Sequence, residues 1–534
     1  MFVITAAKVQ KSKQNAKIFW RFTHFFVISQ ANMITDELTY RIREALGLEP
    51  TAEQNEAIET FARFMTDRHP EAVMVMRGSA GTGKTTLAAA IVKAMTTLGQ
   101  KLVLLAPTGR AAKVFSLYAG HAAFTIHRRI YRQKSLEGRF ELSFNNAQDT
   151  LFMVDEASMI ANASSFSDTI FAGGQLMDDL IRFVYNDRNC RLMFIGDKAQ
   201  LPPVGETDSP ALQTDVLRSY GLHVHECDLS EVLRQSQESG ILWNATRIRS
   251  LGTAGEPAGT AAHRNTWGAT VPSGFPLGLP KIRVAGFDDI RIVPGNELIE
   301  TLADSYSHVG QDETIVVTRS NKRANIYNQG IRNQVLDCED ELCSGDQLMI
   351  VKNNYYWLEE ELRQATEKIE QPMSFLANGD RAVVRRVRRV HEQYGFRFAE
   401  ITMTFPDYDD YELTVMTLLD TLTSEAPALT REQQELLYNK VMEDYADIPH
   451  KADRIKKVKM DRYYNAVQVK FAYAATCHKA QGGQWAHVYI DQGYMTDDML
   501  TADYMHWLYT AFTRATERLY LVNWPEKQTE ESEC

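Results

Sequence analysis

The chain has 534 residues, which is enough for about three to five domains of typical size. Its composition is that of an ordinary globular protein, with 44% hydrophobic and 24% charged residues. These values exclude collagen-like, disordered and disulfide-scaffold chains. The net charge of −11 argues against a protein coated with basic residues, but it permits a local basic channel.

The first 32 residues differ from the rest of the chain. They contain Lys and Arg residues but no Asp or Glu. We interpret residues 1–32 as a basic N-terminal extension, disordered or not native, before an ordered protein that starts at Met33. A functional basic arm is the alternative. The apolar stretch 18–28 contains charge and is too short to cross a membrane, so no membrane association is expected.

The six cysteines contain no CxxC pair. Cys338 and Cys343 resemble half of a zinc site, but no second half follows. We therefore expect reduced thiols and a cytoplasmic protein.

In chain order, helical periodicity covers residues 35–66 with a break at Pro50, and Thr51 is the expected N-cap of the second helix. Short apolar runs then alternate with helical patterns. The expected strands are residues 72–76, 102–106, 151–154 and 191–195. Buried strands that alternate with helices predict an α/β fold with a parallel sheet.

The amino-acid composition changes before the second half of the chain. Ten of the 29 residues in 252–280 are Gly or Pro, which predicts a linker at 251–284. Further strands are expected at 290–293, 314–317, 486–490 and 519–522. The predicted organisation is a first lobe (33–250), a second lobe (285–380 and 466–534) and an insertion in the second lobe (381–465).

A phosphate-binding motif follows the strand at 72–76. The glycines allow backbone N–H groups to approach phosphates, Lys84 reaches the β- and γ-phosphates, and the Thr85 hydroxyl binds Mg²⁺. The residues expected to hold the nucleotide are Gly78, Ser79, Ala80, Gly81, Thr82, Gly83, Lys84, Thr85 and Thr86.

Two acids end the strand at 151–154. Asp155 supplies a ligand for Mg²⁺, and Glu156 orients or deprotonates the attacking water. Gln200 follows the next strand and is placed to sense the γ-phosphate. Arg234 and Arg514 are candidates for the arginines that stabilise the transferring charge.

An ordered series of motifs resembles the superfamily 1 DNA helicases of the 5′→3′ branch, which are RecD-like and Dda-like. The resemblance covers residues 47–525. Besides the P-loop, it rests on these segments: Thr51–Gln54, Ala106–Lys113, Thr125–His127, Asp155–Ser158, Gly196–Val204, Leu229–Gln235, Val317–Lys322, Asn378–Asp380, Thr476–Gly482 and Tyr509–Ala515.

The resemblance implies two RecA-like P-loop lobes with ATP and Mg²⁺ between them. It further implies that Gln54 reads adenine and that Gln200, Arg234 and Arg514 meet the γ-phosphate. The residues that it places on single-stranded DNA, mostly at phosphates, are Pro107, Thr108, His127, Thr318, Arg319, Thr476 and His478. Phosphate contacts give affinity without sequence reading, which suits a motor.

Two inserted parts are expected from the same resemblance. Residues 128–150 take the position of a strand-separating hairpin, with Phe140 or Phe144 stacking on the last base pair; packing on the first lobe is the alternative. The insertion 381–465 takes the position of an SH3-like subdomain, with an additional helical segment at 430–459. Its basic run at 385–389 either lines the DNA path or forms a solvated strand face.

His223 and His225 superficially resemble the metal-binding pair of relaxases. No nucleophilic tyrosine module precedes the motor, so we do not predict a relaxase, and no nuclease carboxylates are visible.

The predicted function is an ATP-dependent 5′→3′ DNA helicase that acts as a monomer on single strands and on junctions with duplex. Recombination, repair or replication proteins are its expected partners. The alternatives are a non-unwinding translocase, a RecD-type subunit of a recombination complex, and a nucleic-acid-gated ATPase switch.

Overall fold

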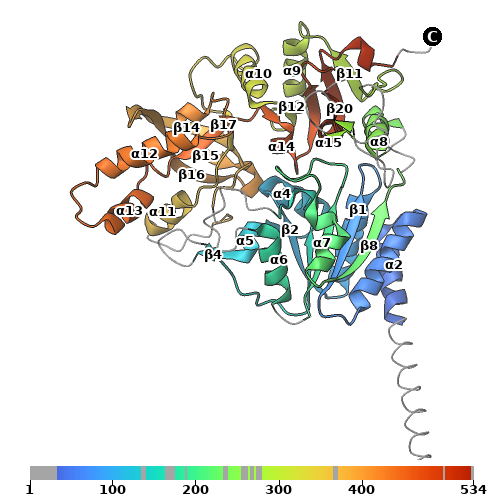
Figure 1. Cartoon of the computed structure of the whole chain (residues 1–534). Coiled ribbons are helices and arrows are strands. Elements are labelled where there is room, and N and C mark those ends of the chain that lie inside the picture. Colours follow the sequence, from blue (N-terminus) through green and yellow to red (C-terminus); the bar gives the residue numbers. More distant parts are fainter. Residues whose placement is uncertain are drawn as a thin grey trace, which may run out of the picture.

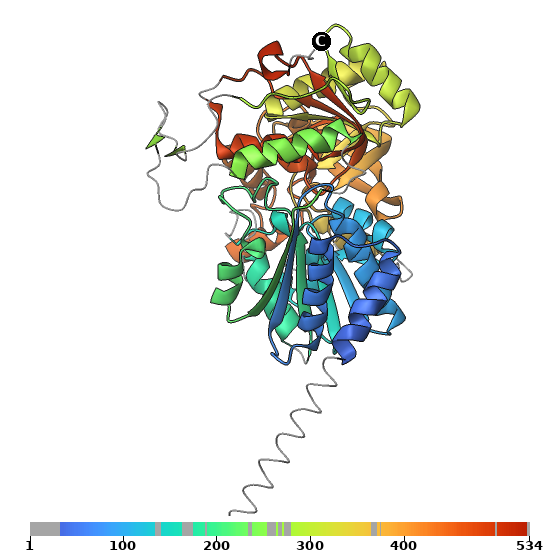
Figure 2. The same ribbon diagram turned by 90° about the vertical axis from the view of Figure 1, so that its right-hand side faces the viewer.

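The computed structural model describes residues 33–133, 140–162, 175–186, 189–232, 238–253, 263–264, 270–271, 279–364, 371–373, 375–496 and 499–530. They form two α/β lobes and a β-barrel beside them (Figure 1). The two lobes are stacked one on the other (Figure 2). Among the described residues, no helix is both long and apolar enough to cross a membrane.

The first lobe is built on a six-stranded parallel sheet with the order β3-β2-β6-β7-β1-β8. Alternate residues of strand β1 face two separate apolar cores, so the sheet is covered on both sides. The strands are β1 (Ala72–Gly78), β2 (Lys101–Ala106), β3 (Ala123–Thr125), β6 (Thr150–Val154), β7 (Arg191–Gly196) and β8 (His223–Leu229).

Helices cover this sheet, and α2 (Ala52–Thr66) confirms a prediction made from the sequence. Thr51 caps α2 in a capping box with Gln54. The helices of the lobe are a segment at 33–46, α2 (Ala52–Thr66), α3 (Lys84–Thr97), α4 (Gly109–Ala119), α5 (Ile126–Ile130), α6 (Leu176–Tyr185) and α7 (Thr214–Ser219). A small hairpin of β4 (Tyr131–Gln133) and β5 (Phe140–Leu142) leaves the lobe after α5.

The second lobe contains a five-stranded parallel sheet with the order β11-β20-β19-β12-β18. Its strands are β11 (Ile290–Val293), β12 (Thr314–Thr318), β18 (Ala474–Thr476), β19 (Trp485–Asp491) and β20 (Ala515–Val522). Its helices are α9 (Leu298–His308), α10 (Asn321–Gln334), α14 (Cys477–Ala480) and α15 (Ala502–Phe512). The predicted pair of RecA-like lobes is therefore confirmed.

Helix α8 (Gly240–Thr253) belongs to the second lobe, although the sequence placed residues up to 250 in the first. Its buried residues Ile241, Ala245 and Ile248 join the apolar core of the second lobe. The Gly240 N–H donates to the Asp289 carboxylate at 2.8 Å, beside β11. Beyond α8, the strands β9 (His263–Arg264) and β10 (Thr270–Val271) pair with each other. The rest of the predicted linker at 254–278 lies outside the described residues.

The predicted SH3-like insertion is a closed five-stranded barrel, but its bounds are wider than 381–465. Its strands are β13 (Gln347–Ile350), β14 (Arg381–Gln393), β15 (Phe396–Phe405), β16 (Tyr411–Leu418) and β17 (Val467–Phe471). Strands β13 and β17 are buried along their whole length although they contain Gln347, Gln468 and Lys470, so their sequences lack the apolar runs of the parallel strands in the lobes. Helix α11 (Tyr356–Gln364) lies between β13 and β14 in the chain.

The topology of the barrel explains why a helical segment is present at 430–459. Strand β17 runs parallel to β16, and parallel neighbours need a long crossover connection. That crossover consists of two helices, α12 (Arg431–Glu443) and α13 (Lys451–Lys459), rather than one. Leu437, Val441 and Val458 pack into the same apolar cluster as the barrel strands.

One cysteine pair also differs from the expectation of reduced thiols. Cys338 and Cys343 form a disulfide, and Arg332 donates to both sulfur atoms at 3.5 Å. Among the described residues, Cys190, Cys227 and Cys477 are buried and are not part of a disulfide.

Candidate nucleotide and DNA site

The P-loop joins β1 to α3 at the carboxyl edge of the first sheet. Gly81 and Gly83 both have a φ of +77°, a conformation that L side chains rarely adopt, so glycine is required at both places. The Lys84 ammonium donates to the Gly78 carbonyl at 2.8 Å, which holds the side chain over the loop. The Thr85 side chain is exposed at the start of α3.

Gln54 lies against this loop and is buried. Its amide nitrogen donates to the Thr82 carbonyl at 3.1 Å, and its oxygen accepts from the Thr51 N–H at 3.1 Å. In this structure Gln54 therefore ties the start of α2 to the P-loop. Both ends of its amide are used, so reading adenine would require it to exchange one of these bonds.

Asp155 and Glu156 follow β6, which β7 separates from the P-loop strand β1 at the same edge of the sheet. Tyr118 donates a short hydrogen bond to one Asp155 oxygen, and the other oxygen accepts from the Glu156 N–H at 2.8 Å. Glu156 has a φ of +50°, a strained conformation for a residue with a side chain. Strain of this kind at the end of a strand is typical of functional sites.

The charges around Glu156 identify the centre of the site. Burial raises the pKa of Glu156, Asp155 and Asp197 act in the same direction, and Arg514 and Lys84 oppose them. Three carboxylates thus face two cations. This balance suits a site that receives Mg²⁺ with a polyphosphate, and a raised pKa makes Glu156 a better acceptor for a proton from water.

Arg514 reaches this group of charges from the second lobe. Its guanidinium is buried and donates to the carbonyls of Thr510 and Gly483, at 3.0 and 3.1 Å. The structure thus places the predicted arginine opposite Glu156, with its bonds still made within its own lobe. Arg234 and Gln235 lie outside the described residues.

Tyr509 joins the two lobes directly at the P-loop, and the sequence did not single it out. Its hydroxyl accepts from the Ala80 N–H at 2.8 Å and donates to Asp197 at 2.6 Å. Tyr509 lies on α15 of the second lobe, whereas Ala80 and Asp197 belong to the first. The sequence signal for this role is its position in the segment Tyr509–Ala515, which also contains Arg514.

Gln200 is buried beside the same contact. The Leu201 N–H donates to the Thr510 hydroxyl at 2.8 Å, and Gln481 donates to the Leu201 carbonyl at 2.6 Å. Within the described part of the chain, the Gln200 side-chain oxygen has no hydrogen-bond partner. A buried oxygen without a partner fits a side chain that gains one when a ligand or water enters the site.

The predicted DNA-binding residues gather at the carboxyl edges of the two sheets. In the first lobe, Pro107 and Thr108 follow β2, and His127 follows the neighbouring strand β3. In the second, the ends of β12 and β18 are paired, with Thr318 opposite Thr476. The pairing of neighbouring strands thus brings these residues together within each lobe.

The two groups also meet across the interface between the lobes. A Cβ built on Gly482, which follows α14, lies 3.1 Å from the Thr108 hydroxyl and 3.2 Å from the Ala111 Cβ. His478 and Arg319 are exposed, and Arg319 lies over the rings of Tyr504 and Trp507.

Thr318 differs from the expectation of a DNA contact. Its side chain is fully buried and its hydroxyl donates to the Ser320 carbonyl at 3.0 Å. The side chain therefore supports the loop at the end of β12, and only the backbone remains for a ligand.

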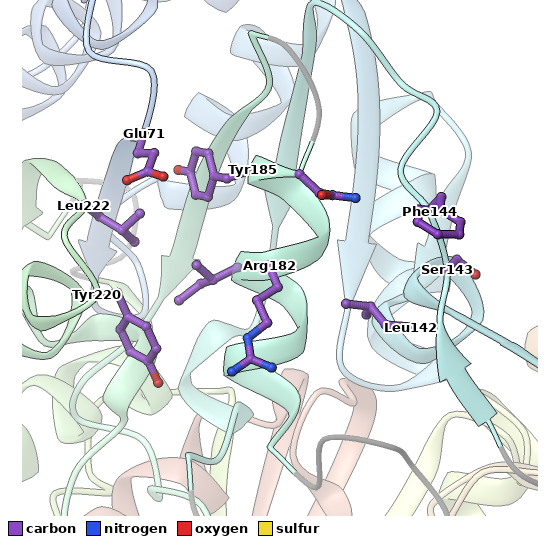
Figure 3. Close-up of a pocket in the computed structure, with 10 residues that line it drawn as sticks. Glu71, Leu142, Ser143, Phe144, Arg182, Tyr185, Tyr220 and Leu222 are labelled. Atoms are coloured by element: carbon purple, nitrogen blue, oxygen red, sulfur yellow. The ribbon is translucent and has the colours of Figure 1, made fainter.

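The two candidate wedge residues occupy different parts of the hairpin. Phe140 starts β5, and the turn expected at 137–138 lies outside the described residues. Phe144 lies beyond β5, 67% exposed, and lines a pocket of about 480 Å³ with Arg182 and Tyr185 of α6 (Figure 3). Arg132 lies 5.1 Å from the centre of the Phe144 ring. Phe144 is thus placed at the base of the hairpin against the first lobe.

The barrel contacts the first lobe at α4. A Cβ on Gly109 would lie 2.4 Å from the Tyr408 hydroxyl, so only glycine allows this close approach. Lys113 donates to the Pro406 carbonyl at 2.6 Å. Arg110 stacks on Trp485 of the second lobe at 4.7 Å and faces Asp407 of the barrel. This arginine therefore lies where all three parts of the protein meet.

Two family models match the chain. A model described as an AAA domain covers residues 49–264, and one described as a UvrD-like helicase C-terminal domain covers residues 471–522. These matches fall on the P-loop lobe and on the β17-to-β20 part of the second lobe.

Several known proteins are similar to the chain. The ATP-dependent RecD2 DNA helicase of Deinococcus radiodurans is 33% identical over 138 residues, which are 25% of this chain and 16% of that protein. The ATP-dependent DNA helicase dda of Enterobacteria phage T4 is 29% identical over 186 residues, 33% of this chain and 38% of that protein. An uncharacterized protein of Acanthamoeba polyphaga mimivirus is 21% identical over 84% of this chain and 94% of its own length.

Among solved structures, a Bacteroides Pif1 helicase in complex with ADP-AlF3 and ssDNA aligns with 91% of this chain and 95% of that chain. The alignment has 15% sequence identity and a TM-score of 0.40. The family models, the RecD2 and Dda relatives and the two P-loop-type lobes agree with one another. The chain is therefore similar, over parts of its length, to ATP-dependent DNA helicases of the RecD2 and Dda type, and it spans only 16% and 38% of the length of these two relatives.

Proposed function

We propose that this protein is an ATP-dependent DNA helicase that moves 5′→3′ along single-stranded DNA and separates duplex strands. The observation that carries the proposal is the shared site between the lobes. Tyr509 of the second lobe bonds both to the Ala80 N–H of the P-loop and to Asp197. A nucleotide that enters or leaves this loop must change the contact between the lobes, and this couples hydrolysis to domain motion.

ATP and Mg²⁺ are the proposed cofactors. Lys84 and the loop amides would hold the phosphates, and Thr85 and Asp155 would hold the metal ion. Glu156 would activate water, while Gln200 and Arg514 would face the γ-phosphate. For Arg514 this requires its guanidinium to leave the carbonyls of its own lobe, a movement that closure of the lobes on ATP would supply. Arg234 keeps the role expected from the sequence.

Single-stranded DNA would cross the carboxyl edges of both sheets. Helix α4 starts there with Thr108 as its N-cap, and α10 starts with Ser320. The amino ends of helices attract anions, so each lobe offers a phosphate contact at the same edge. Two such contacts on lobes that move relative to each other would let the protein step along a strand.

The hairpin and the barrel would handle the duplex. Arg386, Arg388 and Arg389 are exposed on β14, and Arg389 pairs with Glu400 at 3.5 Å. These arginines suit contacts to phosphates of the duplex or of the displaced strand. Polarity follows the family, and partners from recombination, repair or replication, a monomeric state and a cytoplasmic location remain part of the proposal.

Removal of streptavidin from biotinylated oligonucleotides tests movement and direction without any duplex. A 5′→3′ motor with ATP and Mg²⁺ removes streptavidin from a 3′-biotin and leaves a 5′-biotin occupied. Lys84→Ala should abolish removal because it loses the phosphate contact. If single strands stimulate the ATPase but streptavidin stays on both the 3′- and the 5′-biotin, the protein is a nucleic-acid-gated switch and not a motor.

A further inference from the structure

Three side chains with metal-binding atoms meet at the amino edge of the first sheet. His223 and His225 are two residues apart on β8, so both project from the same face of the strand. Asp67 is the C-cap of α2, the helix that packs against β8. One Asp67 oxygen, Oδ2, lies 2.6 Å from His223 Nδ1 and 2.8 Å from His225 Nε2. All three ligand atoms lie within 4.8 Å of one another.

Neighbouring groups hold Asp67 in this orientation. Its other carboxylate oxygen accepts from the His69 N–H at 2.9 Å, which leaves Oδ2 for the two imidazoles. Arg191 donates to the Asp67 backbone carbonyl. The His225 ring packs edge-on against Phe64 at 5.9 Å. The carboxylate and one imidazole are therefore oriented by a second layer of contacts, as metal ligands usually are.

We propose that Asp67, His223 and His225 bind a divalent transition-metal ion, and that Zn²⁺ is the ion best suited to them. Two histidines and one carboxylate are a common zinc-ligand set, and either imidazole nitrogen can coordinate. Zinc–ligand bonds of about 2.0–2.1 Å in a tetrahedron separate ligand atoms by about 3.4 Å. The present separations from Asp67 Oδ2 need to widen by less than about 1 Å to reach this geometry.

Solvent supplies both an entry path and the fourth ligand. The His223 side chain is 55% exposed, whereas those of Asp67 and His225 are 17% and 16% exposed. His69 lies close to His223, with 5.4 Å between the ring centres, but its Nδ1 accepts from the Glu71 N–H at 3.2 Å. His69 Nδ1 is therefore occupied, and the exposed side of His223 leaves room for water as the fourth ligand.

The position of the cluster assigns it a structural role. It lies where β8 begins, at the opposite end of β1 from the P-loop, and β1 is seven residues long. At about 3.3 Å per residue the two sites are about 20 Å apart. The metal ion would join the end of α2 to the edge strand β8, and it would stabilise the first lobe without taking part in ATP chemistry.

Titration of the full-length, untagged protein with Co²⁺ tests the proposal, because tetrahedral Co²⁺ absorbs visible light and reports its ligands. The protein is first treated with EDTA and desalted, and no nucleotide is added. We expect one equivalent of Co²⁺ to bind, Zn²⁺ to displace it, and Zn²⁺ to raise the melting temperature by several degrees. His223→Gln should weaken binding at least tenfold and remove the thermal shift.

One control separates this cluster from the predicted Mg²⁺ site, which Asp155→Asn alters. In the second cluster of potential ligands, Cys338 and Cys343 are joined in a disulfide, so their sulfur atoms are not available to a metal ion. Asp155→Asn should bind Co²⁺ as the wild type does. If His223→Gln fails to fold, Asp67→Asn replaces it as the test. The proposal is overturned if the wild type binds no stoichiometric Co²⁺. It is also overturned if His223→Gln, or Asp67→Asn in its place, binds Co²⁺ as tightly as the wild type.

Discussion

Replacing Tyr509 with phenylalanine isolates the contact between the lobes at the P-loop. The substitution keeps the buried ring and removes only the hydroxyl, which bonds to the Ala80 N–H at 2.8 Å and to Asp197 at 2.6 Å. We expect the lobes to open more often in the absence of nucleotide and the DNA-stimulated turnover of ATP to fall.

The size of the effect follows from the two hydrogen bonds. A bond to a charged group contributes about 1.5–3 kcal/mol and a neutral bond about 1 kcal/mol. Tyr509 and Asp197 are 1% and 2% exposed, so water does not readily replace the lost partner. Closure of the lobes should therefore weaken by about 2.5–4 kcal/mol, which is roughly a 60- to 700-fold change in its equilibrium constant.

Energy transfer between dyes on the two lobes measures this change, and steady-state ATPase measures its consequence. Thr97 and Glu300 are exposed positions for the dyes, one on each lobe. Bound ATP restores part of the lost contact, so we expect kcat with DNA to fall roughly tenfold rather than by the full factor.

Tyr504→Phe is the matched control. Tyr504 lies on the same helix, is 2% exposed and donates to Gln492 at 2.8 Å within the second lobe. It should leave the distance between the lobes unchanged. The reasoning is refuted if Tyr509→Phe and Tyr504→Phe give the same distribution of distances and the same kcat.

Three further predictions concern other parts of the molecule. Lys84→Ala should abolish ATPase, while single-stranded DNA binding, measured by fluorescence anisotropy, should stay within a few fold of the wild type. If the variant loses both DNA binding and its fold, the P-loop has a structural role instead. Burial raises the pKa of Asp380 to about 7, so its folded state binds a proton more tightly than the unfolded chain. The free energy of unfolding should then fall as pH rises from about 4 to about 7, by roughly 3–4 kcal/mol, and urea unfolding of Asp380→Asn should lack this dependence. Phe140→Ala should lower unwinding more than DNA-stimulated ATPase, whereas Phe144→Ala at the base of the hairpin should change both by less than about twofold; equal losses in both assays for Phe140→Ala would exclude a wedge.

The sequence predicted best where local signals and packing agree. Thr51 was identifiable as a cap because Gln54 completes its capping box, and β11 begins and ends where its apolar run does. Parallel strands buried on both faces carry the same signal in each lobe. This explains why the lobes were predictable without knowledge of how they meet.

The same signal failed for the barrel. Strands β13 and β17 are buried but contain Gln347, Gln468 and Lys470, and only the register of β13 with β14 and β17 shows that they close a barrel. The attachment of α8 to the second lobe also depends on contacts distant in sequence, such as Gly240 with Asp289.

At the candidate site, the motifs identified the P-loop and the acids but not the bonds between lobes. Tyr509 and Asp197 are 312 positions apart in the chain, and nothing local to either residue shows that they touch. The meeting of Asp67 with His223 and His225 is of the same kind, since it depends on how α2 docks against β8. The fold determines contacts between segments that are distant in the chain, and the spacing of residues in the sequence does not predict them.

Strand displacement tests the central claim most directly. Purified protein, ATP and Mg²⁺ are mixed with duplexes that carry a single-stranded tail on either the 5′ or the 3′ side. A 5′→3′ helicase separates the strands of the 5′-tailed duplex only, and Lys84→Ala separates neither. Separation from the 3′ tail alone, or from neither tail while single strands still stimulate the ATPase, would contradict the account.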